Sequence, residues 1–387
     1  MRLLSRMSFL VSLLAVALAA PAVASAHRWR GQGWHRGPEH VYLDDNTAGA
    51  NTITGFIRNA DGSLTALPGS PFAAGGAGLG KGLGSQGAIQ VAAHGQYVLA
   101  VDAGSNQISV LQINDDGSLT PVAGSPFASG GVEPNSIAVS GDLVYVENTG
   151  GTAPNYTGFT LTRRGQLQPI PNSTATLAAG SAPGDVVINN DATRLVGVEV
   201  ATSVIDSFRI GWNRTLTPAP GSPYPAQGLG PFGSQFSPTN PNQLFVDNAH
   251  NGTGLGTVSA FNDSADGTLS PIAASPFADQ QTAPCWLVIS HDGRYLYALN
   301  TGSGFVSSYA IARNGTLTLL GSASVAAPGV TTGTDVALST DGSTLYLNEA
   351  ATHTVGAFAV NGGTVTQLVG SPYPTPAGAT TAGVAVS

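Results

Sequence analysis

The sequence predicts an all-β fold, a seven-bladed β-propeller with four antiparallel strands in each blade and a first blade closed by the C-terminal strand. A twelve-residue marker, approximately D-G-S/T-L-T-x-x-x-G-S-P-F, recurs seven times, and successive copies start 48 to 55 residues apart. Each interval holds four short β-type runs separated by turn residues, and no helical periodicity interrupts them. The first repeat lacks one strand, and the C-terminus supplies one.

One repeat illustrates the four strands expected in every blade. Its β-type runs are residues 286–290, 295–300, 305–312 and 316–323. The turns between them contain Asp292-Gly293 and Asn314-Gly315, dipeptides that readily adopt the positive φ angles of tight hairpins. This alternation of short strands and hairpin turns indicates antiparallel pairing within each repeat.

The fourth strand of five repeats carries Ser-Pro-Phe or Ser-Pro-Tyr. Proline has no N–H to donate to a ladder, so this strand is expected at the outer edge of its blade, where proline also hinders edge-to-edge aggregation. The aromatic side chain that follows is expected to fold back onto the neighbouring blade. The prolines are Pro71, Pro126, Pro223, Pro276 and Pro372.

The two ends of the repeat array predict how the ring closes. The first repeat begins at its second strand, residues 41–46, and residues 383–387 match the innermost strand of the other repeats. The sequence of residues 383–387 is similar to that of residues 136–140 in the third repeat. We therefore expect residues 383–387 to pair with residues 41–46 and complete blade 1.

The N-terminus has the features of a secretory signal peptide at residues 1–26. Two arginines precede an apolar stretch, and Ala24-Ser25-Ala26 forms a small-residue cleavage site. The apolar stretch is too short to span a membrane. We expect a secreted protein, extracellular or periplasmic, that does not insert into a membrane. Residues 27–40 are expected to form a flexible polar leader before a propeller at residues 41–387.

The composition supports a folded core and excludes several kinds of partner. The chain has 387 residues and is 42% hydrophobic, whereas only 9% of residues are charged and the formal net charge is −8. Such a sparse, acidic surface offers no electrostatic footprint for nucleic acid. The single cysteine, Cys285, excludes an internal disulfide framework and is expected to be buried and inert.

The markers and the phrase S-H-D-G-R-Y-L-Y-A-L-N at Ser290–Asn300 resemble a known family. The repeats are similar to the secreted lactonase-type seven-bladed propellers, which include 6-phosphogluconolactonases and carboxymuconate cyclases, and to YVTN-type surface propellers. The resemblance covers residues 41–387 and implies the fold. Because one propeller hosts many functions, activity has to be argued from the site.

Several lactonase positions are altered in this sequence. Lactonases usually carry Pro-Arg-His at the start of an inner strand, Asn-Glu after the next strand, and an upstream histidine motif. Here Pro284-Cys285-Trp286 and Thr334-Asp335 stand where Arg-His is expected, and Ser85-Gln86-Gly87-Ala88 replaces the histidine motif. Asn348-Glu349 is retained. The resemblance therefore implies a catalytic role for Glu349 alone.

Polar side chains recur at two neighbouring positions near the end of the second strand of each repeat. Because strand side chains alternate faces, one of these rows is expected to face the next blade and to form an acidic rim near the channel mouth. The alternative is that these side chains cap the following turns, which explains Glu less well than Asp or Asn. The last strand residues are Asp45, Asp102, Asn148, Glu199, Asn248, Asn300 and Glu349, and Asp44, Glu147 and Asp247 are acidic residues of the preceding row.

We expect a ligand site at this channel mouth, on the face that bears the loops between second and third strands. Clustered carboxylates suit a cation, or the hydroxyls of a sugar, better than a phosphate ester. Glu349 and His353 are the candidate catalytic residues, because a histidine beside a carboxylate can act as a general base. The expected ligand-binding residues are Asp102, Glu147, Glu199, Asp247, His250 and Lys81. If a divalent cation such as Ca²⁺ or Mg²⁺ binds, its expected ligands are Glu199, Asp247 and Glu349.

Two functions remain open from the sequence. The first is a secreted, monomeric propeller that binds a small molecule or an extracellular partner at its channel mouth without the usual lactonase catalytic residues. The second is a hydrolase of sugar-type lactones that uses channel carboxylates, with or without a divalent cation. The missing Arg-His pair favours the first, since a lactonase needs donors for the developing oxyanion. The acidic rows support the second, because a bound metal could replace those donors.

Overall fold

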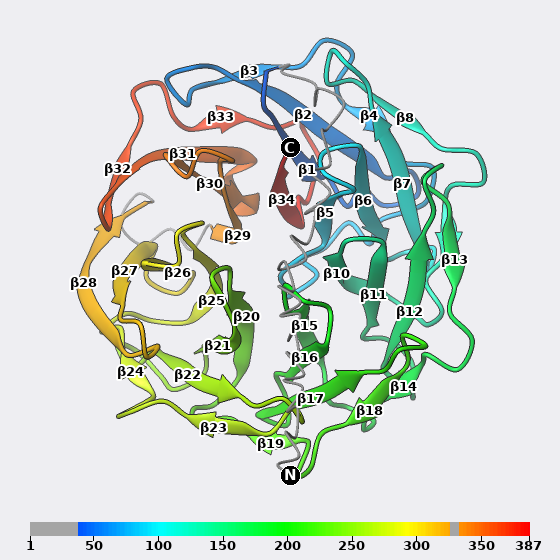
Figure 1. Ribbon diagram of the computed structural model, residues 1–387. Coiled ribbons are helices and arrows are strands. Elements are labelled where there is room, and N and C mark those ends of the chain that lie inside the picture. Colours follow the sequence, from blue (N-terminus) through cyan, green and yellow to red (C-terminus); the bar gives the residue numbers. More distant parts are fainter. Residues whose placement is uncertain (1–37, 326–332) are drawn as a thin grey trace, which may run out of the picture. The chain divides into compact units, whose positions relative to one another are not determined.

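Seven antiparallel sheets form the blades of a ring (Figure 1). The computed structural model describes residues 38–325 and 333–387, so the predicted signal peptide and most of the predicted leader lie outside the described residues. Within each blade the strands pair in sequence order from the channel outwards. The predicted seven-bladed propeller is therefore confirmed. In the part of the chain that the structure describes, no helix is long and apolar enough to cross a membrane.

The blades repeat one arrangement, an inner strand, two long middle strands and an outer strand. Blade 1 contains β34 (Gly383–Val386), β1 (His40–Asp44), β2 (Thr52–Arg58), β3 (Leu64–Ala66) and β4 (Phe72–Ala73). Blade 2 contains β5 (Ile89–Ala92), β6 (Tyr97–Asp102), β7 (Gln107–Ile113), β8 (Leu119–Pro121) and β9 (Phe127–Ala128). Blade 3 contains β10 (Pro134–Ser140), β11 (Leu143–Asn148), β12 (Asn155–Leu161), β13 (Leu167–Pro169) and β14 (Ala175–Thr176).

The remaining blades follow the same order. Blade 4 contains β15 (Pro183–Ile188), β16 (Arg194–Glu199), β17 (Val204–Ile210), β18 (Leu216–Pro218) and β19 (Tyr224–Pro225). Blade 5 contains β20 (Pro231–Ser237), β21 (Asn240–Asn248), β22 (Thr257–Asp263), β23 (Leu269–Pro271) and β24 (Phe277–Ala278). Blade 6 contains β25 (Pro284–Ile289), β26 (Tyr295–Asn300), β27 (Phe305–Ile311) and β28 (Leu317–Ser324). Blade 7 contains β29 (Gly333–Leu338), β30 (Thr344–Glu349), η1 (Ala350–Thr352), β31 (Thr354–Asn361), β32 (Thr364–Gln367) and β33 (Tyr373–Pro374).

The outer strand is interrupted in six blades, a detail that the sequence did not predict. In blade 1, β3 and β4 pair with opposite ends of β2. Between them, the Ser70 hydroxyl accepts a 2.9 Å hydrogen bond from the Gly55 N–H and takes the place of a ladder carbonyl. The break at Ser-Pro therefore leaves this N–H satisfied. The same contact recurs at Ser125, Ser173, Ser222, Ser275 and Ser371.

The core is divided among the joints between blades. Each of seven apolar clusters combines side chains from two adjacent blades. Phe72, the aromatic residue after the Ser-Pro of blade 1, packs against a cluster that includes Tyr42 of its own blade and Val98 of blade 2. The expectation that this aromatic folds onto the neighbouring blade is confirmed.

A recurring hydrogen bond joins each of several blades to the next. It runs from a side chain of the second strand to a carbonyl in the turn between the third and fourth strands of the following blade. The Tyr42 hydroxyl, for example, donates to the Gly117 carbonyl at 2.7 Å. The equivalent donors are Tyr97, Tyr145, Gln243 and Tyr346, which donate to the carbonyls of Arg163, Arg214, Arg313 and Gly62.

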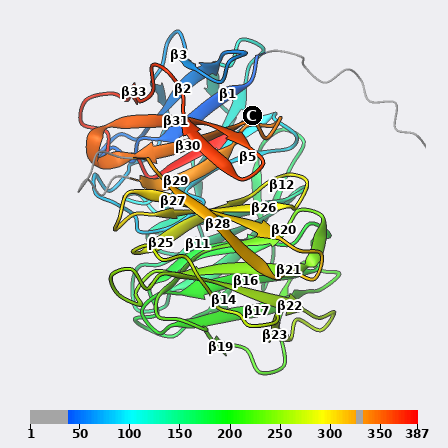
Figure 2. The same cartoon turned by 90° about the vertical axis from the view of Figure 1, so that its left-hand side faces the viewer.

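The C-terminal strand closes the ring as predicted. β34 pairs antiparallel with β1, and Val386 lies opposite Val41. Figure 1 shows the red β34 beside the blue β1, and Figure 2 again places the C-terminal end next to β1. β1 begins at His40, and the Ser387 N–H donates a 3.0 Å hydrogen bond to the His40 carbonyl. His40, assigned to the leader from the sequence, therefore belongs to blade 1.

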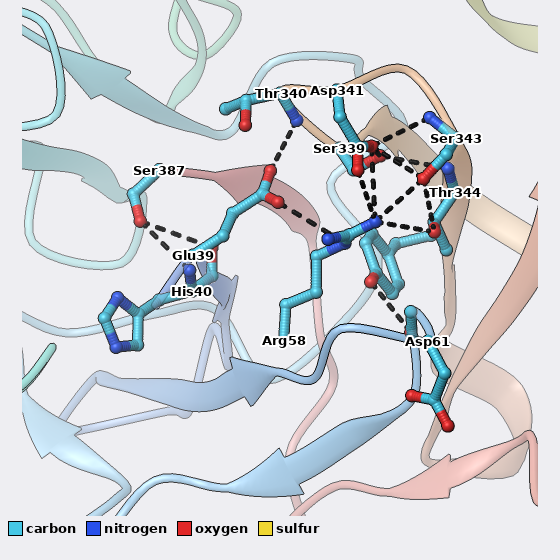
Figure 3. Close-up of polar contacts among 12 residues, drawn as sticks. Glu39, His40, Arg58, Asp61, Ser339, Thr340, Asp341, Ser343, Thr344 and Ser387 are labelled. Carbon is cyan, nitrogen blue, oxygen red and sulfur yellow. Dashed lines mark hydrogen bonds and ion pairs between the residues drawn. The ribbon is translucent and has the colours of Figure 1, made fainter. Parts of the chain in front are cut away.

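An ion cluster reinforces the joint between blades 7 and 1 (Figure 3). Arg58 at the end of β2 lies between two carboxylates. Its Nε is 3.3 Å from Glu39 Oε2, and its Nη2 is 3.0 Å from Asp341 Oδ2 in the turn before β30. Arg58 Nη2 also donates to the Ser343 hydroxyl at 2.8 Å. Residues from both ends of the repeat array therefore meet in one polar contact.

Candidate functional site

The inner strands of the blades form the wall of the central channel, and their free edges explain its polar residues. An edge strand carries N–H groups that need acceptors. The Ser234 N–H donates to Asp185 Oδ2 at 2.8 Å, and the Val384 N–H donates to Asp335 Oδ2 at 3.0 Å. Asp185 and Asp335, each the third residue of its inner strand, thus connect neighbouring blades across the channel wall.

These two carboxyl groups titrate near neutral pH. Burial raises the pKa of Asp185 to about 7 and the pKa of Asp335 to about 8, although the hydrogen bonds that each accepts partly oppose the shift. Protonated and ionised forms are therefore both populated around neutrality. Such groups can donate and accept hydrogen bonds, and can exchange protons with a bound molecule.

A segment from the connection between blades 1 and 2 crosses the channel. The Gln86 N–H donates to the Gly184 carbonyl of blade 4 at 3.0 Å. The Gln86 side chain pairs with the backbone of Leu287 in blade 6, since its Nε2 donates to the carbonyl at 2.8 Å and its Oε1 accepts from the N–H at 3.1 Å. Trp286 Nε1 donates to the Ser85 carbonyl at 3.0 Å. One segment of blade 2 therefore contacts two distant blades.

Two cavities lie on either side of this segment. One, of about 270 Å³, is lined by Asp335 and residues of β25, β29 and β34, and the other, of about 250 Å³, by Asp185 and residues of β10, β15 and β20. Both cavities include Gln86, Gln90 and Gln235.

The cavities extend toward the face that bears the turns between first and second strands. Pro238, in the turn after β20, lines both cavities, and His291, in the turn after β25, lines the larger one. This face is opposite to the predicted one. None of the described residues that line the two cavities is Lys or Arg.

The acidic residues at the ends of second strands bond within their own blades. Ser109 donates to Asp102 Oδ2 at 2.5 Å, and Thr354 donates to Glu349 Oε2 at 2.6 Å. Glu199 likewise accepts a hydrogen bond from the Thr202 hydroxyl. Hydroxyl groups on the following loop or strand therefore account for this row, including the two glutamates. None of these carboxylates lines either cavity.

Glu147 and Asp247, from the preceding row, point toward the channel wall. Glu147 is completely buried, and neither of its carboxyl oxygens has a hydrogen-bond partner within 3.5 Å among the described residues. Burial, together with the nearby Asp185 carboxylate, raises the Glu147 pKa well above its usual value, and the Asn135 amide offsets this only in part. Asp247 Oδ1 accepts a 2.9 Å hydrogen bond from the Gly233 N–H, and burial raises its pKa as well.

The remaining predicted residues lie at the exposed rim. His250, His353 and Lys81 are all exposed. His353 Nδ1 lies 2.8 Å from the Ala379 carbonyl, whereas Glu349 bonds Thr354, so the candidate catalytic residues each have a different partner.

The predicted cation ligands, Glu199, Asp247 and Glu349, come from blades 4, 5 and 7. Within residues 38–325 and 333–387, no group of three or more His, Cys, Asp or Glu side chains is arranged to hold a metal ion.

The channel residues were accessible from the sequence only indirectly. Gln86 and Asp335 stand where lactonases carry histidine, and we interpreted them as losses rather than as lining residues. The first interval between markers is 55 residues, whereas three of the other five are 48 residues. The additional residues belong to the connection that crosses the channel, so the interval length was the available signal.

Comparison with known proteins places the fold. Residues 243–371 match the family model described as lactonase, 7-bladed β-propeller. No curated protein sequence matches the chain significantly. A proposed 6-phosphogluconolactonase from Bacteroides uniformis has a similar structure, with a TM-score of 0.71 and 18% identity over 90% of this chain and 99% of that one.

Two further solved structures show the same likeness. A proposed 6-phosphogluconolactonase from Bacteroides fragilis has a TM-score of 0.68 and 20% identity, covering 92% of this chain and all 100% of its own. The periplasmic gluconolactonase PpgL of Pseudomonas aeruginosa has a TM-score of 0.69 and 17% identity, covering 90% and 98%. At these identities the likeness establishes the fold. Together with the family match, it identifies the chain as a lactonase-type seven-bladed β-propeller.

Proposed function

We propose that this propeller binds a small, uncharged, hydroxylated molecule in its central channel. The observation that carries the proposal is the pair of cavities, of about 270 and 250 Å³, lined by glutamine amides and by the Asp185 and Asp335 carboxyls. Pockets for drug-sized ligands typically measure roughly 300–1,000 Å³, so these cavities suit a smaller molecule, of monosaccharide size. The ligand would arrive from the face that bears the turns between first and second strands.

The chemistry of the lining supports a neutral sugar or sugar lactone. A glutamine amide offers both a donor and an acceptor, and the half-buried Gln90 side chain makes no hydrogen bond to residues 38–325 or 333–387. Carboxyls with pKa values of about 7 and 8 add further donors and acceptors. A phosphate group would find no cationic partner among the lining residues described. We therefore favour a lactone without phosphate, whereas the names of the two Bacteroides neighbours refer to a phosphorylated one.

Binding is favoured over hydrolysis because the channel-facing N–H groups are already engaged. Those of Ser234, Leu287 and Val384 donate to Asp185, Gln86 and Asp335. An oxyanion would have to displace these acceptors to gain the same donors. Hydrolysis is the second candidate, and the Asp335 pKa of about 8 favours it, since a carboxylate with such a pKa is a competent general base near neutrality.

The test is calorimetric titration with D-gluconolactam, a hydrolysis-resistant lactone analogue, together with a pH-stat assay of D-glucono-1,5-lactone with and without EDTA. We expect saturable binding that weakens about tenfold or more in Gln90→Ala. Gln112→Ala, an exposed glutamine on β7, is the matched control and is expected to bind as the wild type does. Absence of binding by the wild type would overturn the proposal. Lactone turnover that is lost in Asp335→Asn would replace it with the hydrolase.

We also propose that the protein is exported. The positive, apolar and small-residue regions of residues 1–26 support export, and the name of the Pseudomonas aeruginosa neighbour describes it as periplasmic. After expression in a bacterial host, N-terminal sequencing of the exported fraction is expected to start at His27. Recovery of the chain only from the cytoplasm with Met1 retained would contradict export.

A further inference from the structure

The connection from β4 to β5 is bound first to the rim of the ring. The Gly78 N–H donates to the Thr47 carbonyl at 2.9 Å, and the Gly80 N–H donates to the Asn46 carbonyl at 2.8 Å. Glycine is required for this close approach, because a Cβ at Gly78 would lie 2.2 Å from the Asn46 carbonyl carbon. The first half of the connection is therefore fixed against the loop between β1 and β2.

Its second half is bound across the channel. The Ser85 hydroxyl donates to the Asn135 carbonyl of blade 3 at 2.7 Å, in addition to the contacts with blades 4 and 6 described above. The opposite wall is shaped to receive Gln86, since a Cβ on Gly233 would lie 2.4 Å from Gln86 Oε1. Asp247 Oδ2, which has no hydrogen-bond partner among the described residues, would lie 3.0 Å from the same Cβ. Gln86 is thus held by three blades and fitted against a fourth.

We propose that Ser85–Gly87 is a plug that closes the channel toward the loop face, and that the Gln86 side chain sets the size of the ligand by dividing the channel into two half-sites. The size rule rests on the proposed function, whereas the plug stands on the hydrogen bonds alone. Both cavities include Gln86, so its removal joins two spaces of about 270 and 250 Å³ into one. The divided channel accepts a monosaccharide-sized molecule, and the joined channel accepts a disaccharide-sized one.

The inner strand of blade 6 offers an internal control for the plug. Two of its channel-facing amides are each capped by a glutamine from a different blade. The Leu287 N–H donates to Gln86 Oε1 at 3.1 Å, and the Ile289 N–H donates to Gln235 Oε1 at 2.7 Å. Gln86 is part of the plug, whereas Gln235 belongs to β20. Removing one glutamine is expected to expose only its own amide.

The first experiment measures hydrogen exchange at these two amides by NMR, without any ligand. In Gln86→Ala we expect exchange at Leu287 to accelerate at least about tenfold while Ile289 keeps its wild-type rate. In Gln235→Ala the effects are expected to reverse. Gln86→Met keeps the bulk of the side chain without its hydrogen bonds, and it serves if Gln86→Ala folds poorly. Unchanged exchange at Leu287 in both Gln86 variants would overturn the plug.

The second experiment measures size selection by calorimetry with D-gluconolactam and cellobionolactone. We expect the wild type and Gln86→Met to prefer the smaller probe by about tenfold or more, and Gln86→Ala to bind both. Equal affinity of the wild type for both probes would overturn the size rule. If neither probe binds any variant, the proposed function fails together with the size rule, and the exchange rates alone decide whether the plug exists.

Discussion

The phenolic hydroxyl of Tyr346 in blade 7 donates a 2.8 Å hydrogen bond to the carbonyl of Gly62 in blade 1, across 284 residues of sequence. Equivalent hydrogen bonds join other neighbouring blades, so the joint between the last and first blades has the same geometry as joints within the chain. The ring is therefore closed by the strand pairing of β34 and by a side-chain contact that every passage of the repeat can supply.

Replacing Tyr346 by Phe is expected to lower the free energy of unfolding by about 1–2 kcal/mol, because the buried Gly62 carbonyl loses its donor. Denaturant unfolding monitored by far-ultraviolet circular dichroism measures the change. Tyr309→Phe is the control, since the Tyr309 hydroxyl is buried and has no hydrogen-bond partner among the described residues. Its removal is expected to be neutral or stabilising. Equal losses in the two variants would show that the Tyr346 hydrogen bond contributes nothing.

The Arg58 cluster is expected to contribute more than an exposed ion pair. The Arg58 and Glu39 side chains are only 10% and 13% exposed, whereas those of Arg294 and Asp292 are 71% and 46% exposed. Arg58→Gln is expected to destabilise the protein by roughly 2 kcal/mol, because it leaves a nearly buried carboxylate without its partner. Arg294→Gln is expected to change stability by less than about 0.5 kcal/mol. Thermal unfolding of the two variants side by side decides the ranking.

Stability is expected to rise as the pH falls from 8.5 to 5.5. Burial raises the pKa of Asp335 to about 8 and the pKa values of Asp185 and Asp206 to about 7. In the unfolded chain these groups ionise near pH 4, so the folded state binds more protons between pH 4 and 8, and the free energy of unfolding falls as the pH rises through that range.

Differential scanning calorimetry is expected to show a midpoint roughly 5 °C higher at pH 5.5 than at pH 8.5. Asp335→Asn cannot ionise and is expected to show a smaller difference, which isolates the contribution of one group. Exposed Asp266, whose pKa is lowered to about 2 by hydrogen bonds led by that from Ser264, acts only below pH 4 and leaves this window unaffected. A midpoint that rises with pH would contradict the assignment.

Deletion of residues 383–387 is expected to abolish the cooperative thermal transition and to cause aggregation. The deletion removes β34 and leaves the inner edge of β1 unpaired, and such an edge is a template for pairing with another chain. Light scattering and calorimetry measure the two effects. A circular permutant that joins Ser387 to Glu39 through a short turn keeps the strand and is expected to remain folded and monomeric. A deletion variant that melts like the wild type would show that β34 is dispensable.

Cys285 is expected to be unreactive in the folded protein. It is 8% exposed, its thiol donates to the Ala283 carbonyl at 3.3 Å, and burial raises its pKa far above the usual value. Labelling with Ellman's reagent is expected to require hours in buffer and only minutes in 6 M guanidinium, because the thiolate is the reactive form. Complete labelling within minutes in buffer would contradict this burial.

The blades could be predicted from the sequence because their signals are local. Asp292-Gly293 fixes one hairpin and Ser-Pro marks one outer strand, and neither depends on residues far away in the chain. The pairing of residues 383–386 with β1 was also predictable, since a repeat that lacks its first strand can be completed only by a matching segment elsewhere. The break in the outer strand was not predicted, because it depends on the Ser70 hydroxyl reaching the middle of β2.

The candidate site was harder to predict because its contacts join different blades. The bonds of Glu199 to Thr202 and of Glu349 to Thr354 span three and five residues, so these structural roles could have been recognised from the spacing. Asp335, by contrast, accepts from Val384, and Gln86 reaches Leu287, 201 residues away. No periodicity in the sequence encodes these distances, which are set by the diameter of the closed ring.

Because blade 1 is assembled from both ends of the chain, its completion has a fixed place in the time course of synthesis. Residues 383–386 leave the ribosome after every other strand of the ring, so blades 2 to 7 can pair internally while β1 still waits for its inner neighbour. A nascent chain halted anywhere earlier carries an unsatisfied edge that quality-control proteins can detect. The arrival of the final strand hides that edge, and it marks a finished molecule by the same contact that stabilises it.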